Sequence, residues 1–115
     1  MTDRTPAHLA DMLQFVQELQ SFVNGVPVDA FVQNRVLCLA TEKLFINLGE
    51  AASRMGLQTT AMIPNVPWRQ IVGLRNVLAH GYEAVAHEVL YRTAQDDLPG
   101  VERALQKALE AYRLP

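Results

Sequence analysis

Apolar side chains recur at steps of three and four residues along nearly the whole chain, and this spacing most constrains the fold. The first such stretch runs from about Ala7 to Asn24. Its apolar positions are Leu9, Met12, Leu13, Val16, Leu19 and Val23. Such steps place side chains on one face of an α-helix, and no alternating run of strand type competes with them. The sequence therefore predicts an all-α protein.

Helix breakers and caps divide this pattern. Gly25 and Pro27 end the first helix. Asp29 is the expected N-cap of a long second helix that reaches Met55, with Gly56 directly after its end. This second helix is apolar on more than one side, which is typical of a helix at the centre of a bundle or of one that also faces a partner subunit.

The second half of the chain continues the helical pattern. After a connection over residues 57–67, a third helix is expected over Trp68–His80 and a fourth over about Val85–Gln95. Asp96, Asp97 and Pro99 mark the start of a last helix, whose apolar positions are Val101, Ala104, Leu105, Ala108, Leu109 and Tyr112. With no repeat and no long linker, residues 1–115 are predicted to form one domain, a compact antiparallel bundle of about four to five helices.

Composition narrows the location and the class of partner. The formal net charge of −2 offers no support for a bulk polyanion binder or a basic membrane-surface protein. No apolar segment of leader type follows the N-terminus and no run approaches the ~20 residues of a membrane span, so a cytoplasmic location is expected. The single cysteine, Cys38, excludes an internal disulfide and a multi-cysteine zinc site, and its apolar surroundings predict burial.

The distribution of charge differs from its sum. Between Glu50 and Glu83 lie 32 residues without a single Asp or Glu. This interval contains Arg54, Arg69, Arg75 and His80. One segment of the chain is therefore locally basic although the whole is slightly acidic.

The order of residues inside this segment is specific. Residues 67–82 read PWRQIVGLRNVLAHGY. This string resembles the HepT-like toxins of the HEPN superfamily (higher eukaryotes and prokaryotes nucleotide-binding domains), whose signature is Arg, four residues, His, one residue, Tyr, after a Pro-Trp-Arg entry and a Gly-x-Arg-Asn step. Those positions are filled here by Pro67, Trp68, Arg69, Gly73, Arg75, Asn76, His80 and Tyr82.

The resemblance covers most of the chain from about Val28 onward. Gly49-Glu50-Ala51 is similar to a step on the family's long helix, and Leu98-Pro99 to the start of its last helix. The family commonly continues after the tyrosine with an aromatic residue, a glycine and an aspartate. Here residues 83–86 read EAVA, so that aspartate is missing.

The residue types at the motif suit RNA cleavage. Histidine exchanges protons near neutral pH, and the permanent charge of arginine stabilises a phosphate in its transition state. RNA supplies its own nucleophile, the 2′-OH, so Arg75 and His80 are the candidate catalytic pair of a metal-independent endoribonuclease. His80, Glu83 and His87 are the one close cluster of possible metal ligands, and their spacing matches no standard zinc motif.

Helix geometry complicates this pairing. Residues five positions apart lie roughly 140° apart around an α-helix. Either the helix ends near His80, with Gly81 allowing the imidazole to swing back, or two copies of the segment face each other across a dimer axis. Members of the resembled family are homodimers whose motifs face across the interface, so the resemblance favours the second arrangement.

The resemblance also implies a regulatory partner. It implies a toxin that is neutralised by a nucleotidyltransferase antitoxin similar to MntA, which either modifies the hydroxyl of Tyr82 with AMP or occupies the same cleft. Two further residues are assigned supporting roles: Asn76 is expected to orient Arg75 or a phosphate, and Glu50 to pair with an arginine.

Less specific interpretations remain open. The same helical dimer could be a non-catalytic subunit that binds nucleotide or protein beside a nucleotidyltransferase, or a purely structural adaptor. His80 could be a surface residue or helix cap, and Arg75 could pack its stem along the helix. Trp68 is interpreted as a core residue rather than a base-stacking platform, and His8 and His87 as solvated.

Overall fold

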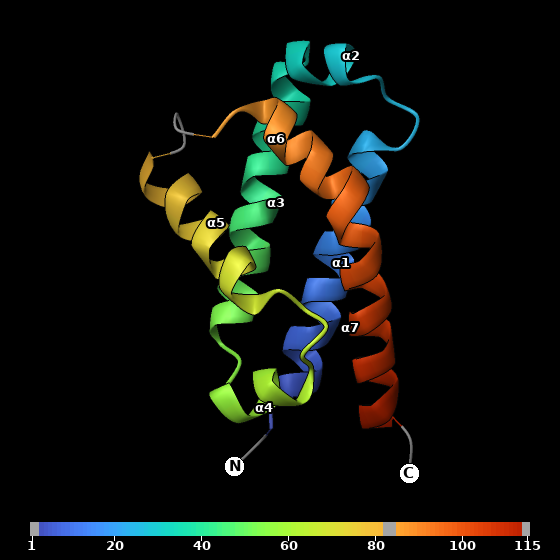
Figure 1. Ribbon diagram of the computed structural model, residues 1–115, viewed down its shortest axis with the longest axis vertical. Helices are drawn as coiled ribbons and strands as arrows, with labels where there is room; N and C mark the ends of the chain where they lie inside the picture. The colour runs from blue at the N-terminus through green and yellow to red at the C-terminus, as the bar shows by residue number, and fades with distance from the viewer. Residues whose placement is uncertain (1–2, 82–84, 114–115) are drawn as a thin grey trace.

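The computed structural model describes residues 3–81 and 85–113, and every element in these ranges is helical (Figure 1). Four long helices form the bundle: α1 (Thr5–Val23), α3 (Arg35–Ser53), α5 (Trp68–Gly81) and α7 (Leu98–Arg113). Helix α5 packs on α3, α3 on α1, and α1 on α7. Each of these neighbours runs antiparallel to the next (Figure 1). The predicted all-α antiparallel bundle is confirmed.

The core lies where the predicted apolar faces meet. Helix α1 buries Leu9, Met12, Val16 and Leu19 completely, and α7 buries Val101, Leu105 and Leu109 against it. Burial of each large aliphatic side chain stabilises the fold by about 1.5–3 kcal/mol. The three-and-four spacing therefore located both the helices and the faces that they bury.

The predicted long second helix is wrong in two respects. Asp29, the expected N-cap, lies inside the first turn of α2 (Val28–Gln33), whose N-cap is Pro27. The predicted helix is also divided into α2 and α3 at Asn34, whose backbone is extended at φ −93° and ψ 97°. The Asn34 side chain accepts a hydrogen bond from the Leu37 amide at 3.0 Å and so caps α3. An asparagine side chain can replace a backbone acceptor in this way, which favours a helix start over a helix interior.

Cys38 lies directly after this break and is buried, as the sequence predicts. Its thiol lies 3.2 Å from the Phe31 carbonyl oxygen and donates to it. Burial, reinforced by the negative charge of Glu42, raises the pKa of the thiol. The side chain is therefore an unreactive part of the core.

Two further segments differ from expectation. The connection over residues 57–67 contains a short helix, α4 (Leu57–Met62). Helix α6 (His87–Arg92) continues without a loop through a π-helical turn, η2 (Thr93–Asp97), into α7. Pro99 explains the wide turn, because a proline ring inside an α-helix clashes with the carbonyl four residues earlier.

His87, which is expected to be solvated, has a side chain that is 39% exposed and that also contacts α3. Its Nε2 lies 2.5 Å from Oε2 of Glu42, and this contact ties α6 to α3. His8 is partly buried on α1 rather than fully exposed. The contact between His87 and Glu42 could not be placed from the sequence, because it depends on how α6 packs on α3.

None of the described helices combines the length and the apolar character that crossing a lipid bilayer demands.

Candidate functional site

Trp68 anchors the start of the motif segment. The indole Nε1 of Trp68 donates to the Ile63 carbonyl oxygen at 2.9 Å, and the ring packs against the core. This fixes the start of α5 against the segment before it. The interpretation of Trp68 as a core residue is confirmed, although its side chain is only partly buried.

Helices α3 and α5 approach most closely at a glycine. A Cβ atom added at Gly49 would overlap the Cβ of Arg75, lie 2.7 Å from its Cγ and 3.1 Å from the Ile71 carbonyl oxygen. Only glycine fits this crossing, so the absence of a side chain at Gly49 lets the stem of Arg75 rest on α3. The stem therefore packs on α3, whereas one interpretation expected it to pack along its own helix.

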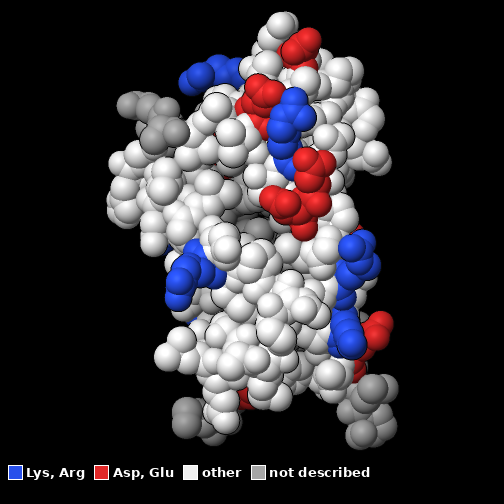
Figure 2. All heavy atoms as spheres, viewed as in Figure 1, with Lys and Arg blue, Asp and Glu red and all other residues white. Residues whose placement is uncertain are grey.

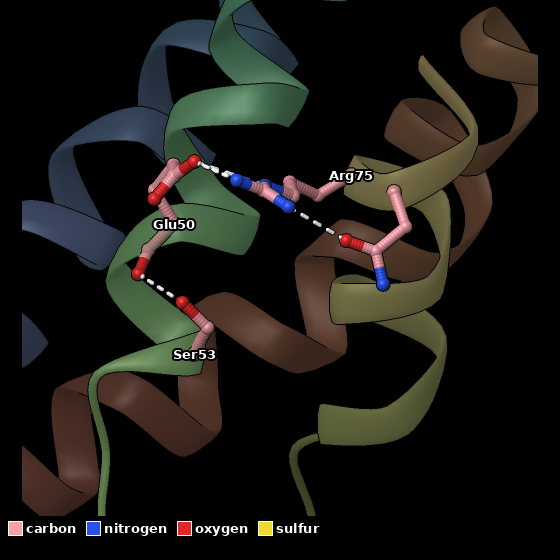
Figure 3. Close-up of polar contacts among 4 residues, drawn as sticks. Glu50, Ser53 and Arg75 are labelled. Atoms are coloured by element: carbon pink, nitrogen blue, oxygen red, sulfur yellow. Dashed lines mark hydrogen bonds and ion pairs between the residues drawn. The ribbon is translucent and has the colours of Figure 1, made fainter. Parts of the chain in front are cut away.

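The guanidinium of Arg75 is held by side chains of both helices (Figure 3). Its Nε donates to Oε1 of Glu50 at 2.9 Å, its Nη2 forms an ion pair with the same oxygen, and its Nη1 donates to Oδ1 of Asn76 at 2.7 Å. The hydroxyl of Ser53 donates to the Glu50 backbone carbonyl at 2.8 Å and closes the last turn of α3 (Figure 3). The structure thus brings Glu50, Arg75 and Asn76 together.

The positive charges around Glu50 determine the ionisation of its carboxyl group. The hydrogen bonds from Arg75 lower the pKa of the Glu50 carboxyl, and the charges of Arg75, Arg54 and Lys43 lower it further against the opposing effect of burial. Glu50 is therefore an anion at neutral pH. A guanidinium has five N–H donors, and three donor contacts are made here. Arg75 keeps hydrogen-bonding capacity for a further anion.

His80 lies apart from this cluster. Helix α5 continues through Gly81, so His80 keeps its helical direction, and its side chain is exposed. Among the described residues, no hydrogen bond or ion pair joins His80 to Arg75. Asn76, which accepts the hydrogen bond from Nη1 of Arg75, lies one helical turn before His80 on α5. Tyr82 lies outside the described residues.

Gly49 is a site residue that sequence reasoning did not single out. It was noted only as part of the Gly-Glu-Ala step, without a role. A glycine inside a helix costs about 1 kcal/mol of stability relative to alanine. Its presence on an apolar face could therefore have indicated a close packing contact. The partner that supplies this reason, Arg75, is 26 positions away, and helical periodicity cannot identify it.

A wide surface groove lies away from Arg75 and His80. It has a volume of about 930 Å³ and lies between α5 and α7, with Phe45 and Leu48 of α3 among its lining residues. Neither Arg75 nor His80 lines it. In the described part of the chain, no group of three or more His, Cys, Asp or Glu side chains is arranged to hold a metal ion.

Comparison with known proteins finds one family model and several named relatives. A family model described as "Ribonuclease HepT-like" matches residues 12–108. "Putative RNase MJ1380" of Methanocaldococcus jannaschii is 27% identical over 100 residues, which cover 87% of this chain and 92% of the relative. "Putative RNase TTE0752" of Caldanaerobacter subterraneus subsp. tengcongensis is 28% identical over 108 residues, covering 93% and 96%.

A third relative carries the family's own name. "Probable ribonuclease HepT" of Thermococcus cleftensis is 23% identical over 100 residues, covering 87% of this chain and 91% of the relative. No solved structure matches the chain significantly.

Proposed function

The chain belongs to the HepT-like ribonuclease family, and from that premise we propose that it is the toxin endoribonuclease of a toxin–antitoxin pair. It cuts RNA through Arg75 and His80 without a metal ion. The observation that carries this proposal is the fixed guanidinium of Arg75, which Glu50 and Asn76 orient on an otherwise acid-free segment of the chain.

The division of labour follows from the residue types. Neutral His80 takes the proton of a ribose 2′-OH, and O2′ forms a bond to the neighbouring phosphorus while the bond from phosphorus to O5′ breaks. The leaving O5′ takes a proton from a protonated imidazole. The products are a 2′,3′-cyclic phosphate and a 5′-hydroxyl. Arg75 stabilises the charge that builds up on the phosphoryl oxygens, and Glu50 and Asn76 are positioning residues.

Two copies of the chain complete this site. Because no hydrogen bond or ion pair joins His80 to Arg75 among the described residues of one copy, a two-fold axis that places the two α5 helices on opposite sides of a shared cleft supplies an arginine and a histidine to each phosphate. It also supplies a second imidazole as proton donor. Apolar side chains for such an interface are exposed on α3, where Val36 is 78% and Leu39 is 47% accessible.

A direct test uses purified protein and single-stranded RNA in EDTA. We expect cleavage by the wild type, and a rate about 10²–10⁴-fold lower for His80→Ala, because general acid–base catalysis contributes a factor of that size. Arg103→Ala, an exposed arginine on α7, is the matched control and should cleave normally. Equal cleavage by wild type and His80→Ala would exclude this pair as the catalyst.

The proposed antitoxin is a nucleotidyltransferase that modifies Tyr82. The phenolic oxygen would form a bond to the α-phosphorus of ATP, releasing pyrophosphate and the phenolic proton. The added phosphate lies two residues from His80, where its charge and bulk oppose an RNA phosphate. Mass spectrometry of the protein after incubation with such a partner and ATP should show AMP on Tyr82 together with loss of RNA cleavage. Loss of cleavage with unmodified Tyr82 would instead indicate that the partner blocks the cleft.

A further inference from the structure

The outward face of α5 carries a row of residues that the protomer does not use for packing. Positions 69, 73, 76 and 80 follow steps of four, three and four, which place them within about 60° of one another around the helix. We call Arg69, Gly73, Asn76 and His80 the outer stripe of α5. All four residues are exposed. Arg75 lies off this stripe, but its Nη1 reaches it through Asn76.

Gly73 is the informative member of the outer stripe. A glycine inside a helix costs about 1 kcal/mol relative to alanine, so its presence needs a reason. At Gly49 the reason is the contact with Arg75, whereas a Cβ added at Gly73 would meet no atom within 4 Å. Within the described residues nothing requires a glycine there. The missing side chain instead leaves the helix backbone open to close approach from outside.

The charge of the outer stripe of α5 indicates which class of ligand it binds. Arg69 forms no ion pair with the described residues, and no acidic residue occurs between Glu50 and Glu83. In Figure 2 most of the acidic side chains of the visible face lie over the upper part of the molecule, and a few more lie at its lower right edge. An arginine, an amide and an imidazole in one row around an open backbone suit a polyanion better than an apolar protein surface.

We propose that the outer stripe of α5 is the track on which the RNA backbone lies, with Arg69 binding a phosphate away from the cleaved bond. This rests on the proposed ribonuclease function and adds a substrate-binding residue to it. Eleven residues at 1.5 Å per residue separate Arg69 from His80 by about 16 Å, a length that a few nucleotides span. Gly73 lets the strand pass close to the helix between these two points.

The test measures binding apart from cleavage. The probe is a fluorescein-labelled, fully 2′-O-methylated single-stranded oligonucleotide, which lacks the nucleophilic hydroxyl and stays intact. We expect Arg69→Ala to bind it about tenfold more weakly. The slope of log affinity against log salt should also fall by about 0.7, the value for one phosphate contact with a single strand. Arg103→Ala is the matched control and should change neither quantity.

Gly73 gives the sharper test, because stability and binding should move in opposite directions. Gly73→Ala and Gly73→Gln should raise the thermal unfolding midpoint by about 2–6 °C while weakening binding of the probe, more so for glutamine. Gly100→Ala on α7 is the control: its Cβ meets only Arg103 Nη2 at an ordinary 3.7 Å. It should leave binding unchanged.

Several results would contradict the proposal that RNA binds along the outer stripe of α5. Equal effects of Arg69→Ala and Arg103→Ala would do so, as would unchanged binding by Gly73→Gln or no binding of the probe by wild type. A change in oligomeric state of Gly73→Gln, measured by light scattering without RNA, would show that the stripe faces a second copy instead. If the probe binds as expected but wild type cuts no RNA, the ribonuclease proposal fails and the track remains.

Discussion

Contacts on both sides of the Arg75 guanidinium hold this charged group in one orientation. Glu50 on α3 accepts hydrogen bonds from Nε and Nη2, and Asn76 on α5 accepts one from Nη1. Three directional contacts to a planar group fix both its position and its plane. A phosphate that enters the site therefore meets a guanidinium that needs little further ordering, which is how preorganised charges accelerate a reaction.

Replacement of Arg75 by lysine tests this geometry rather than the charge. Lysine keeps the positive charge but has no planar fork with which to contact Glu50 and Asn76 together. We expect kcat/KM for RNA cleavage by Arg75→Lys to fall by about 10²–10³-fold. Arg103→Lys should remain fully active. Wild-type activity in Arg75→Lys would mean that a point charge suffices and that the fixed plane has no catalytic role.

Glu50 should give the fold a dependence on acid pH. Because Arg75 lowers the pKa of this carboxyl in the folded state, the pair stabilises the fold above the unfolded-state pKa of about 4.3. This contribution is lost as the pH falls through the lower, folded-state pKa. The unfolding midpoint of wild type should therefore exceed that of Glu50→Gln at pH 7, and the difference should shrink below about pH 4.

The exposed Glu110 on α7 supplies the control for this titration. Glu110→Gln should follow the wild-type curve across the same range. A difference between wild type and Glu50→Gln that stays constant from pH 7 to pH 3 would show that the ionised pair does not contribute to stability.

At the scale of the helices, the crossing of α3 and α5 depends on Gly49. A methyl group at this position would overlap the stem of Arg75 and crowd the Ile71 carbonyl. We expect Gly49→Ala to lower the free energy of unfolding by about 1–3 kcal/mol, as overpacking typically does, and to reduce RNA cleavage because Arg75 is displaced. Gly73→Ala, which meets no atom, should instead stabilise the protein. Urea unfolding and RNA cleavage measure both effects.

The helices also show where sequence reasoning stops. Periodicity located α1, α5 and α7 because their buried side chains recur every three or four residues along the chain. It missed the break at Asn34, since a polar residue between apolar neighbours reads equally well as a surface position in a continuous helix. It also separated α6 from the last helix, where a π turn accommodates Pro99 and keeps the helical run continuous.

For the whole molecule, the dimer is the prediction with the largest consequence. Val36 is 78% exposed, so Val36→Arg should not destabilise an isolated protomer, yet it would place a charge in the proposed interface. We expect wild type to be a dimer by light scattering, and Val36→Arg to be a folded monomer with strongly reduced RNA cleavage. Leu57→Arg is the control, because Leu57 is 89% exposed on α4, away from the proposed interface.

A monomeric wild type that still cleaves RNA would contradict the two-copy site. A dimeric and active Val36→Arg would place the interface elsewhere. The first result would require His80 and Arg75 of one chain to act on the same phosphate, whereas the second would leave the two-copy site in place with a different interface.

The all-α class, the start of α5 and the family of the chain could be predicted from the amino-acid sequence, because helix periodicity and a contiguous motif are local properties. The structure was needed to show that Arg75 rests on Gly49 and pairs with Glu50 while His80 is exposed. Those relations depend on the angle and distance at which two helices cross. Pairs of residues 25 and 26 positions apart set that crossing through packing, and a local sequence pattern contains no information about such pairs.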